Sequence, residues 1–220
     1  MGCSSGPDII QDGLVLCVDA SNSRSYPGTG TTWYDLSKNK YNGTLINTPT
    51  FVSDEGGSYF YFNGTDERVD FDYLQPAYQT TTDFTWCIWI YPFSSSSVGV
   101  AMGNRYNSAG TDNPRVFCKL TPLRMEFYPS TIFTSMLSRE WQQVIIVKNQ
   151  TNLFYYRNAE LLTSITSNTT MSQTSPFSIA GDHTGAESLQ ARVNSCHVYD
   201  IPFSAEQVRQ HYLATKERYA

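Results

Sequence analysis

Residues 32–45 read TWYDLSKNKYNGTL, and this stretch decides how the rest of the chain is interpreted. Asn and Gly tolerate a positive φ, so residues 37–39 and the pair Asn42-Gly43 are expected to form tight turns. Trp33 supplies an apolar anchor, and Asp35 is placed to cap a turn. The stretch therefore predicts an ordered loop that is fixed to the surface of a sheet and leads into a strand.

The composition is typical of an all-β protein. Of the 220 residues 14% are aromatic and only 16% are charged, and Tyr (15) and Phe (12) are abundant, whereas strong helix formers are scarce. The formal net charge is −5. An acidic chain argues against nucleic acid as a partner, because binding to phosphate requires clustered Lys and Arg. No apolar run approaches the ~20 residues of a membrane span, so no membrane association is expected.

The domain organisation is predicted to be simple, with a polar arm at residues 1–12 and a single domain at residues 13–220. The opening MGCSSG has neither a basic segment nor an apolar core, so no signal peptide is expected. It partly matches a myristoylation start, but Gly6 stands where Ser or Thr is required, which favours a flexible arm. No repeat, charge block or linker divides the remainder.

The five cysteines are widely spaced and lack any CxxC pair, and four of them lie in strand-like runs. Buried free thiols in a reducing compartment fit this pattern best. A single disulfide between Cys17 and Cys196 across the terminal strands remains open. The cysteines are Cys3, Cys17, Cys87, Cys118 and Cys196.

Runs of strand length alternate with turn residues along the chain. Residues 84–91 are apolar on both faces, which predicts an interior strand, and residues 67–73 alternate with Val69 and Phe71 on one side. Residues 63–66 predict a hairpin-type turn. About a dozen such strands imply a two-sheet antiparallel sandwich. The expected strands are residues 13–19, 43–47, 58–62, 67–73, 84–91, 98–102, 115–120, 123–128, 141–147, 153–157, 160–165, 177–180 and 191–199.

One helix is predicted, at residues 204–218. Ser204 is a suitable N-cap, and Gln207 stands three residues later, where a capping box requires Glu or Gln. Helical spacing places an apolar and aromatic set on one face of this helix. The set comprises Val208, Tyr212, Thr215 and Tyr219.

The order and spacing of these motifs resemble a known family, the LamG-like or concanavalin A-type jelly roll. Within this family, the chain resembles the short versions found in virion proteins of tailed bacteriophages. The resemblance implies two antiparallel sheets with the helix packed outside. The matching segments are residues 13–20, 25–28, 31–37, 42–45, 62–66, 84–85 with 89–92, 141 with 144–147, and 198–199 with 203–208.

The resemblance implies a non-enzymatic virion protein, either a capsid decoration (cement) protein or a tail-associated knob or fibre component. Such a protein would be made in the host cytoplasm and would contact capsid or tail proteins. A symmetric homo-oligomer is the default for such assemblies, with a trimer favoured on capsids. The alternative is a carbohydrate-binding lectin module that recognises host-surface glycans, because this fold hosts many functions.

Catalysis is not expected, and no catalytic residue is assigned. Glycosidases require two carboxylates that flank the sugar bond, and the Glu-x-Asp-x-x-Glu string of jelly-roll glucanases does not occur. The nearest acidic cluster is interpreted as a solvated polar face around Arg68. The three histidines are expected to be isolated packing or surface residues. An inactive or divergent glycosidase is a third alternative for the function. The acidic cluster is Asp66, Glu67, Asp70 and Asp72, and the histidines are His183, His197 and His211.

Two kinds of ligand are weighed from the loops. No cofactor is expected, although a structural calcium remains open because calcium takes oxygen ligands from loop residues. Exposed loop aromatics could stack on a sugar, but the preferred interpretation is that they pin their loops to the sheets. The possible calcium ligands are Asp19, Asp35, Asn39, Asp66 and Asp182, and the possible sugar platforms are Trp33, Tyr34, Tyr41 and Tyr106.

Overall fold

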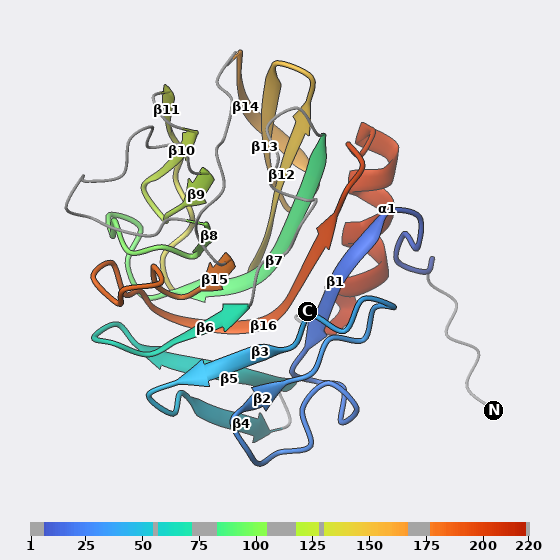
Figure 1. Cartoon of the computed structure of the whole chain (residues 1–220). Coiled ribbons are helices and arrows are strands. Elements are labelled where there is room, and N and C mark those ends of the chain that lie inside the picture. The colour runs from blue at the N-terminus through green and yellow to red at the C-terminus, as the bar shows by residue number, and fades with distance from the viewer. Residues whose placement is uncertain are drawn as a thin grey trace.

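The computed structural model describes residues 7–54, 57–71, 83–104, 118–127, 130–166 and 177–218, with only the backbone described at residues 118, 127, 130 and 218. Its strands form two antiparallel sheets, which confirms the predicted all-β sandwich (Figure 1). In order across sheet A lie β14 (Glu160–Thr166), β13 (Asn152–Arg157), β12 (Gln142–Asn149), β7 (Phe84–Pro92), β16 (Gln190–Tyr199), β5 (Gly57–Asn63) and β4 (Thr50–Asp54), with β1 (Leu14–Asp19) also paired to β16. In order across sheet B lie β11 (Ser130–Phe133), β10 (Arg124–Phe127), β9 (Cys118–Leu120), β8 (Met102–Gly103), β15 (Phe177–Ile179), β6 (Arg68–Phe71), β3 (Gly43–Ile46) and β2 (Thr32–Trp33).

Strand β16 organises sheet A. Its first half pairs with β5, its second half pairs with β1, and β7 pairs along its other side. The register against β7 shifts between Val193 and Ser195, which leaves Asn194 as a bulge. The Asn194 Nδ2 group donates to the Ser21 hydroxyl at 2.8 Å and to the Ser58 carbonyl at 2.6 Å. This bulge ties Ser21, at the start of the long loop of residues 21–42 that follows β1, to sheet A.

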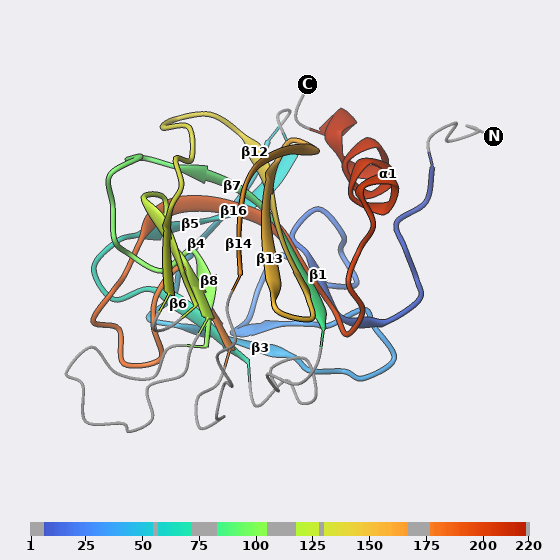
Figure 2. The same ribbon diagram turned by 90° about the horizontal axis from the view of Figure 1, so that it is seen from above.

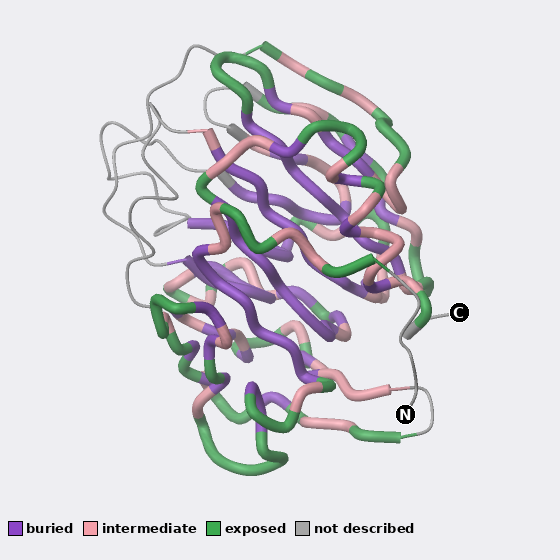
Figure 3. The backbone as a smooth tube through the Cα atoms, turned by 90° about the vertical axis from the view of Figure 1, so that its right-hand side faces the viewer, coloured by how far each residue is buried: buried purple, intermediate pink, exposed green. Residues whose placement is uncertain are grey.

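One large apolar cluster fills the space between the sheets. Strand β7 contributes Trp86, Ile88 and Ile90, and the Trp86 ring meets that of Phe177 from sheet B edge-on at 5.1 Å. Buried backbone therefore follows the central strands, and exposed segments lie at connections and outer strands (Figure 3). Burial of apolar surface on this scale is the main favourable term in folding.

The C-terminal helix covers the outer face of sheet A (Figure 2). Helix α1 (Ala205–Thr215) begins at the predicted N-cap Ser204, whose capping box with Gln207 is present, and one 3-10 turn follows at Lys216–Arg218. None of the described helices is long and apolar enough to span a membrane. A second apolar cluster lies beneath α1 and explains why β7 is apolar on both faces. That cluster contains Cys87, Ile145, Val147, Tyr156, Tyr199, Phe203 and Val208.

The buried side of α1 differs in part from the predicted one: Val208 and Thr215 are buried as predicted, but His211 is buried with them. Tyr212 is only half-buried and stacks on Trp89 with ring centroids 5.9 Å apart. Tyr219 lies outside the described residues. The helix therefore directs the polar His211 side chain toward the sheet, where it needs hydrogen-bond partners.

The prediction that the histidines are isolated is wrong for two of them. His197 Nδ1 lies 2.9 Å from His211 Nε2, and His211 Nδ1 lies 3.1 Å from Gln143 Nε2. Gln143 Nε2 and the Trp89 indole N–H both donate to the Thr215 hydroxyl. Since Gln143 donates to Nδ1, His211 carries its proton on Nε2 and donates it to His197. The pair is a buried structural network, and its packing role agrees with the sequence interpretation.

Three short strands that the sequence does not predict complete the sheets, namely β2, β4 and β11. After β3 the chain reverses into β4, and Asn47 and Thr48 in this reversal both have φ 58°. Residues 63–66 form the expected turn but not a hairpin, because β5 belongs to sheet A and β6 to sheet B. Of the expected strand 98–102, only its last residue lies in β8.

The terminal regions and thiols complete the description. Cys17, Cys87 and Cys196 are buried free thiols, so the structure contains no Cys17–Cys196 disulfide. Burial raises the pKa of the Cys196 and Cys87 thiols. The side chains of Cys3 and Cys118 lie outside the described residues. In the described part of the predicted arm, Ile10 packs against the cluster beneath α1 and Gln210 donates to the Asp8 carbonyl at 2.9 Å.

Candidate functional site

The first long loop, residues 21–42, encloses an open pocket of about 460 Å³ beside strand β1. A volume of this size lies within the range of ligand-binding pockets in proteins. We call it the first-loop pocket. Its lining combines one aromatic ring, two cations, one carboxylate, one amide and one aliphatic side chain: Arg24, Tyr34, Asp35, Leu36, Lys40 and Asn42.

Asp35 holds the loop on the sheet. Its Oδ1 accepts from the backbone N–H groups of Cys17 (2.9 Å) and Ser37 (2.8 Å). Its Oδ2 accepts from the Tyr41 N–H (2.9 Å) and lies 2.6 Å from the Ser37 hydroxyl. Both carboxylate oxygens are therefore occupied by protein donors. The predicted turn cap is confirmed, and Asp35 is an anchor for the pocket floor.

Trp33 and Tyr34 are neighbours in sequence with opposite roles. Trp33 is 0% exposed and packs edge-on against Phe60 at 4.8 Å, which confirms the predicted anchor. Tyr34 is 44% exposed, while its backbone N–H donates to the Ser25 carbonyl (2.7 Å) and its carbonyl accepts from the Ser25 hydroxyl (2.6 Å). The Tyr34 ring is thus presented to solvent from a fixed backbone.

The predicted positive φ falls on Lys40 (φ 60°) and not on Gly43. Gly43 belongs to β3, where an added Cβ would lie 2.6 Å from a Val69 methyl group. Its small size is therefore required by close packing and not by a turn. Asn42 Oδ1 accepts from the Asp35 N–H at 3.0 Å, so the Asn42 amide remains as a donor at the pocket. The left-handed residue at position 40 sets where the lysine side chain leaves the loop.

The two cations of the first-loop pocket have no carboxylate partner among the described residues. Arg24 is fixed only through its backbone, whose N–H donates to Asn22 Oδ1 at 3.0 Å. Lys40 Nζ has one contact, with the Asp35 carbonyl at 3.4 Å. Both side chains are exposed. Sequence reasoning missed them, although Arg24, Lys38 and Lys40 outnumber the single acid Asp35 between residues 20 and 53 in a chain with 20 acidic and 15 basic residues.

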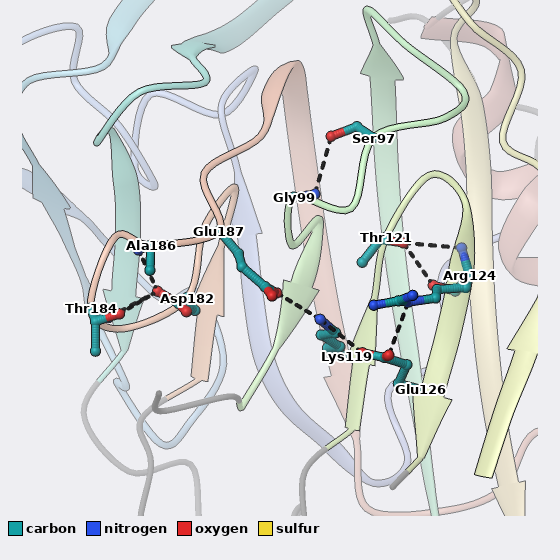
Figure 4. A network of polar contacts seen from close by, with 10 residues as sticks. All are labelled: Ser97, Gly99, Lys119, Thr121, Arg124, Glu126, Asp182, Thr184, Ala186 and Glu187. Carbon is teal, nitrogen blue, oxygen red and sulfur yellow. Dashed lines mark hydrogen bonds and ion pairs between the residues drawn. The ribbon is translucent and has the colours of Figure 1, made fainter. Parts of the chain in front are cut away.

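A second charged region lies in sheet B, where Lys119 of β9 is buried between Glu126 of β10 and Glu187 (Figure 4). The Nζ–Oε2 distances are 2.8 and 2.6 Å. Arg124 pairs with Glu126 as well, at 2.9 Å. These charges neutralise one another. Both glutamates are held in ion pairs, so the arrangement does not provide the two carboxyl groups that flank the sugar bond in a glycosidase. The network joins the loop before β16 to strands β9 and β10.

The acidic cluster around Arg68 is not the solvated face that the sequence suggests. Arg68 Nε and Asp70 lie 3.1 Å apart with side chains that are 13% and 12% exposed. His183 Nδ1 lies 3.3 Å from Asp70. Burial raises the pKa of Asp70, and Arg68 opposes that shift. Glu67 accepts from the Asn63 N–H at 2.7 Å and so closes the turn at residues 63–66. Asp72 lies outside the described residues.

The residues considered for calcium are not brought together. The described residues contain no group of three or more His, Cys, Asp or Glu that could hold a metal ion. Asp182 Oδ1 accepts from Thr184 and from the Ala186 N–H, as Figure 4 shows, and so caps its own loop. Of the aromatics considered for sugar, Tyr34 lines the first-loop pocket, Tyr41 packs against the core and Tyr106 lies outside the described residues.

The architecture and the pocket define a class: an all-β, two-sheet sandwich with an outer helix and a loop pocket beside one sheet. The family model described as the concanavalin A-like lectin/glucanases superfamily matches residues 63–209, and the chain belongs to that superfamily. No curated protein matches the chain significantly.

Solved structures share the fold at low identity. Domain 4 of an extracellular GH43 arabinanase from Geobacillus stearothermophilus, in complex with arabinotriose, has a TM-score of 0.70 and 12% identity and is covered in full by 92% of this chain. The binding domain of a paraclostridial mosquitocidal protein has a TM-score of 0.66 and 16% sequence identity, and the match covers 92% of this chain and 52% of that one. The sialidase of Trypanosoma rangeli has a TM-score of 0.66 and 15% sequence identity, and the match covers 96% of this chain and 34% of that one. This chain therefore spans about half the length of the mosquitocidal binding domain and about a third of the length of the sialidase.

Proposed function

We propose that this protein is a non-enzymatic glycan-binding module and that its sugar site is the first-loop pocket. The observation that carries the proposal is Tyr34, which is 44% exposed at the pocket while its backbone is held by Ser25. An aromatic ring of this kind can stack on the apolar face of a pyranose, and the neighbouring Asn42 amide can bind a hydroxyl group.

The rigidity of the pocket supports the proposal. Asp35 fixes the loop through four donors, and the Leu36 N–H donates to the Cys17 carbonyl at 2.8 Å. A preformed site loses little conformational entropy on binding, which raises the affinity for a small ligand. The family and the arabinotriose-bound neighbour are consistent with a sugar-binding role, although that ligand belongs to the arabinanase domain.

A glycan array tests this function. The protein is expected to bind at least one class of glycan, and Tyr34→Ala should reduce binding to the same glycans by tenfold or more through loss of the stacking surface. Phe133→Ala is the matched control, because Phe133 is also an exposed aromatic but lies on β11 outside the pocket. An array without any bound glycan, or equal binding by wild type and Tyr34→Ala, would contradict the proposal.

A second candidate function is a structural protein of a bacteriophage virion, in a capsid decoration or a tail-associated position. The observation that favours it is exposed apolar surface on the outermost strands of both sheets. Phe133 of β11 is 72% exposed, and Leu161 and Leu162 of β14 are also exposed. Edge strands with such side chains are suited to contacts with other chains, including further copies in a trimer.

Two measurements test the virion candidate. Proteomics of purified particles should detect the chain, and its absence from the particles would contradict this function. Light scattering should report a homo-oligomer whose association is weakened by Phe133→Glu or by Leu161→Glu. A monomer at all accessible concentrations would argue against an assembly role, while leaving the glycan-binding proposal intact.

A further inference from the structure

We infer that the first-loop pocket selects saccharides that carry an anionic substituent, a carboxylate or a sulfate, over their neutral counterparts. This inference rests on the proposed glycan-binding function and adds the chemical class of the ligand. It is carried by Arg24 and Lys40, which line the same pocket as the exposed Tyr34 ring.

The state of these two cations differs from that of four basic residues in sheets A and B, which are paired with carboxylates. Lys119, Arg68, Arg124 and Lys148 all lie within 4 Å of a carboxylate. Arg24 forms no ion pair with any described residue, and Lys40 contacts only a backbone carbonyl. Two cations that line one pocket and form no ion pair with a described carboxylate can receive an anion from a ligand, and Arg presents a planar donor set suited to carboxylate or sulfate.

The one acidic residue of the pocket does not oppose such a ligand. The Asp35 carboxylate is 2% exposed, and its oxygens already accept from Cys17, Ser37 and Tyr41. Its charge is thus offset locally by protein donors. The backbone around it also fixes both cations, because Tyr41 N–H binds Asp35 next to Lys40, and Asn22 caps the turn that carries Arg24.

The charge of the whole chain makes the local arrangement informative. At a formal net charge of −5, long-range electrostatics disfavour the approach of an anionic ligand. Specific attraction must therefore come from groups at the site, where Arg24 and Lys40 line the pocket and the one acidic residue, Asp35, is buried. Such attraction weakens as salt screens it, with a Debye length of ~10 Å at 0.1 M.

Titration calorimetry with matched saccharide pairs tests the inference. The carboxylate arm compares trigalacturonic acid with its methyl ester, and the sulfate arm compares a chondroitin sulfate tetrasaccharide with its desulfated form. At least one anionic form should bind about tenfold more tightly than its matched, less charged form, since bonds to charged groups are the stronger ones. Raising the salt from 50 to 300 mM should narrow that difference, and the arm that responds identifies the substituent.

Three variants assign the effect to the pocket. Arg24→Gln and Lys40→Gln should each lower the affinity for the more highly charged form severalfold and so reduce the ratio of the two affinities within the responding pair. Lys38→Gln is the matched control, because it removes the same charge from an exposed position of the same loop that does not line the pocket. It should have less than a twofold effect.

The outcomes separate this inference from the function on which it rests. Equal affinities within both pairs, or binding of neutral array glycans alone, would overturn anion selection while the glycan-binding function stands. A loss with Lys38→Gln as large as that with Lys40→Gln would overturn the assignment to the pocket. No binding to any saccharide, in either arm or on the array, would overturn the proposed function itself.

Discussion

Cationic side chains behave in opposite ways in two regions of this molecule. In sheet B, Lys119 is 1% exposed and lies between two carboxylates at 2.6 and 2.8 Å. In the first-loop pocket, Arg24 and Lys40 are exposed and meet no carboxylate of the described residues. A buried cation is stable only when anions and hydrogen bonds replace its water, whereas an exposed one keeps its water until a ligand displaces it.

The comparison separates scaffold from function. Lys119 holds strands β9 and β10 to the loop before β16, so its removal should affect folding. Arg24 and Lys40 hold nothing in place, so their removal should affect binding alone. Charged residues in the two regions look alike in the sequence, and only their partners distinguish them.

The largest effect is expected for Lys119→Met. Removing the cation leaves Glu126 and Glu187 facing each other without their shared partner, which should lower the free energy of unfolding by about 3 kcal/mol. Chemical denaturation followed by tryptophan fluorescence measures it. Lys148→Met is the matched control, since Lys148 lies 3.7 Å from an Asp83 side chain that is 31% exposed. The control should lose about 1 kcal/mol or less, and equal losses in the two variants would contradict the scaffold role of Lys119.

Asp35→Asn should follow, with a loss of about 2 kcal/mol. An amide has one acceptor oxygen, so the Tyr41 N–H or the Cys17 and Ser37 N–H groups would lose their partner in a buried site. Because the same bonds position Lys40 and Tyr34, the variant should also weaken glycan binding. Asp66→Asn, on the exposed turn after β5, serves as control and should change stability by less than ~0.5 kcal/mol. A stable Asp35→Asn variant would show that the loop does not depend on this carboxylate.

Features of this fold that depend on local patterns could be predicted from the sequence. The double-sided apolar strand at β7 follows from consecutive residues, as does the capping box of α1. Asp35 as a turn cap also follows from near neighbours, because Ser37 and Tyr41 donate to its carboxylate. Trp33 as an anchor follows from its aromatic side chain, which packs in the core beside its own loop. Patterns of this range determine strands, caps and turns.

Features that depend on long-range placement could not be predicted. The His197–His211 contact joins β16 to α1, and the turn after β5 crosses between sheets although it has the residues of a hairpin turn. The first-loop pocket needs Arg24 and Lys40 together, and that depends on a left-handed Lys40 that no glycine signals. Only the excess of basic residues in the loop hinted at the pocket.

A smaller effect is expected from mild acid, which tests a third region where charge is excluded. Burial, and secondarily His197, lowers the pKa of His211 well below 6.5. Below pH ~6.5 the unfolded chain therefore binds a proton that the folded chain does not, so the free energy of unfolding should fall by up to about 1.4 kcal/mol per pH unit. Above that pH this residue contributes no slope.

Urea denaturation between pH 7.5 and 5.0 measures the slope. His211→Gln should flatten it, whatever the stability of the variant at neutral pH, because the titrating group is gone. His183→Gln is the control, since His183 is partly exposed beside Asp70 and is not part of the helix interface. A wild-type protein whose stability does not change between pH 6.5 and 5.5 would contradict the exclusion of a proton from this interface.

The smallest effects on stability are expected in the first-loop pocket. Tyr34→Ala and Arg24→Gln remove exposed side chains that support no other group, so each should change the free energy of unfolding by less than about 0.5 kcal/mol. Their binding defects should nonetheless be large, which is the inverse of the Lys119→Met result. Thermal melts of these variants beside wild type check this. If Arg24→Gln destabilised the protein as much as Lys119→Met, the pocket cation would be a scaffold element, and the contrast between the two regions would be lost.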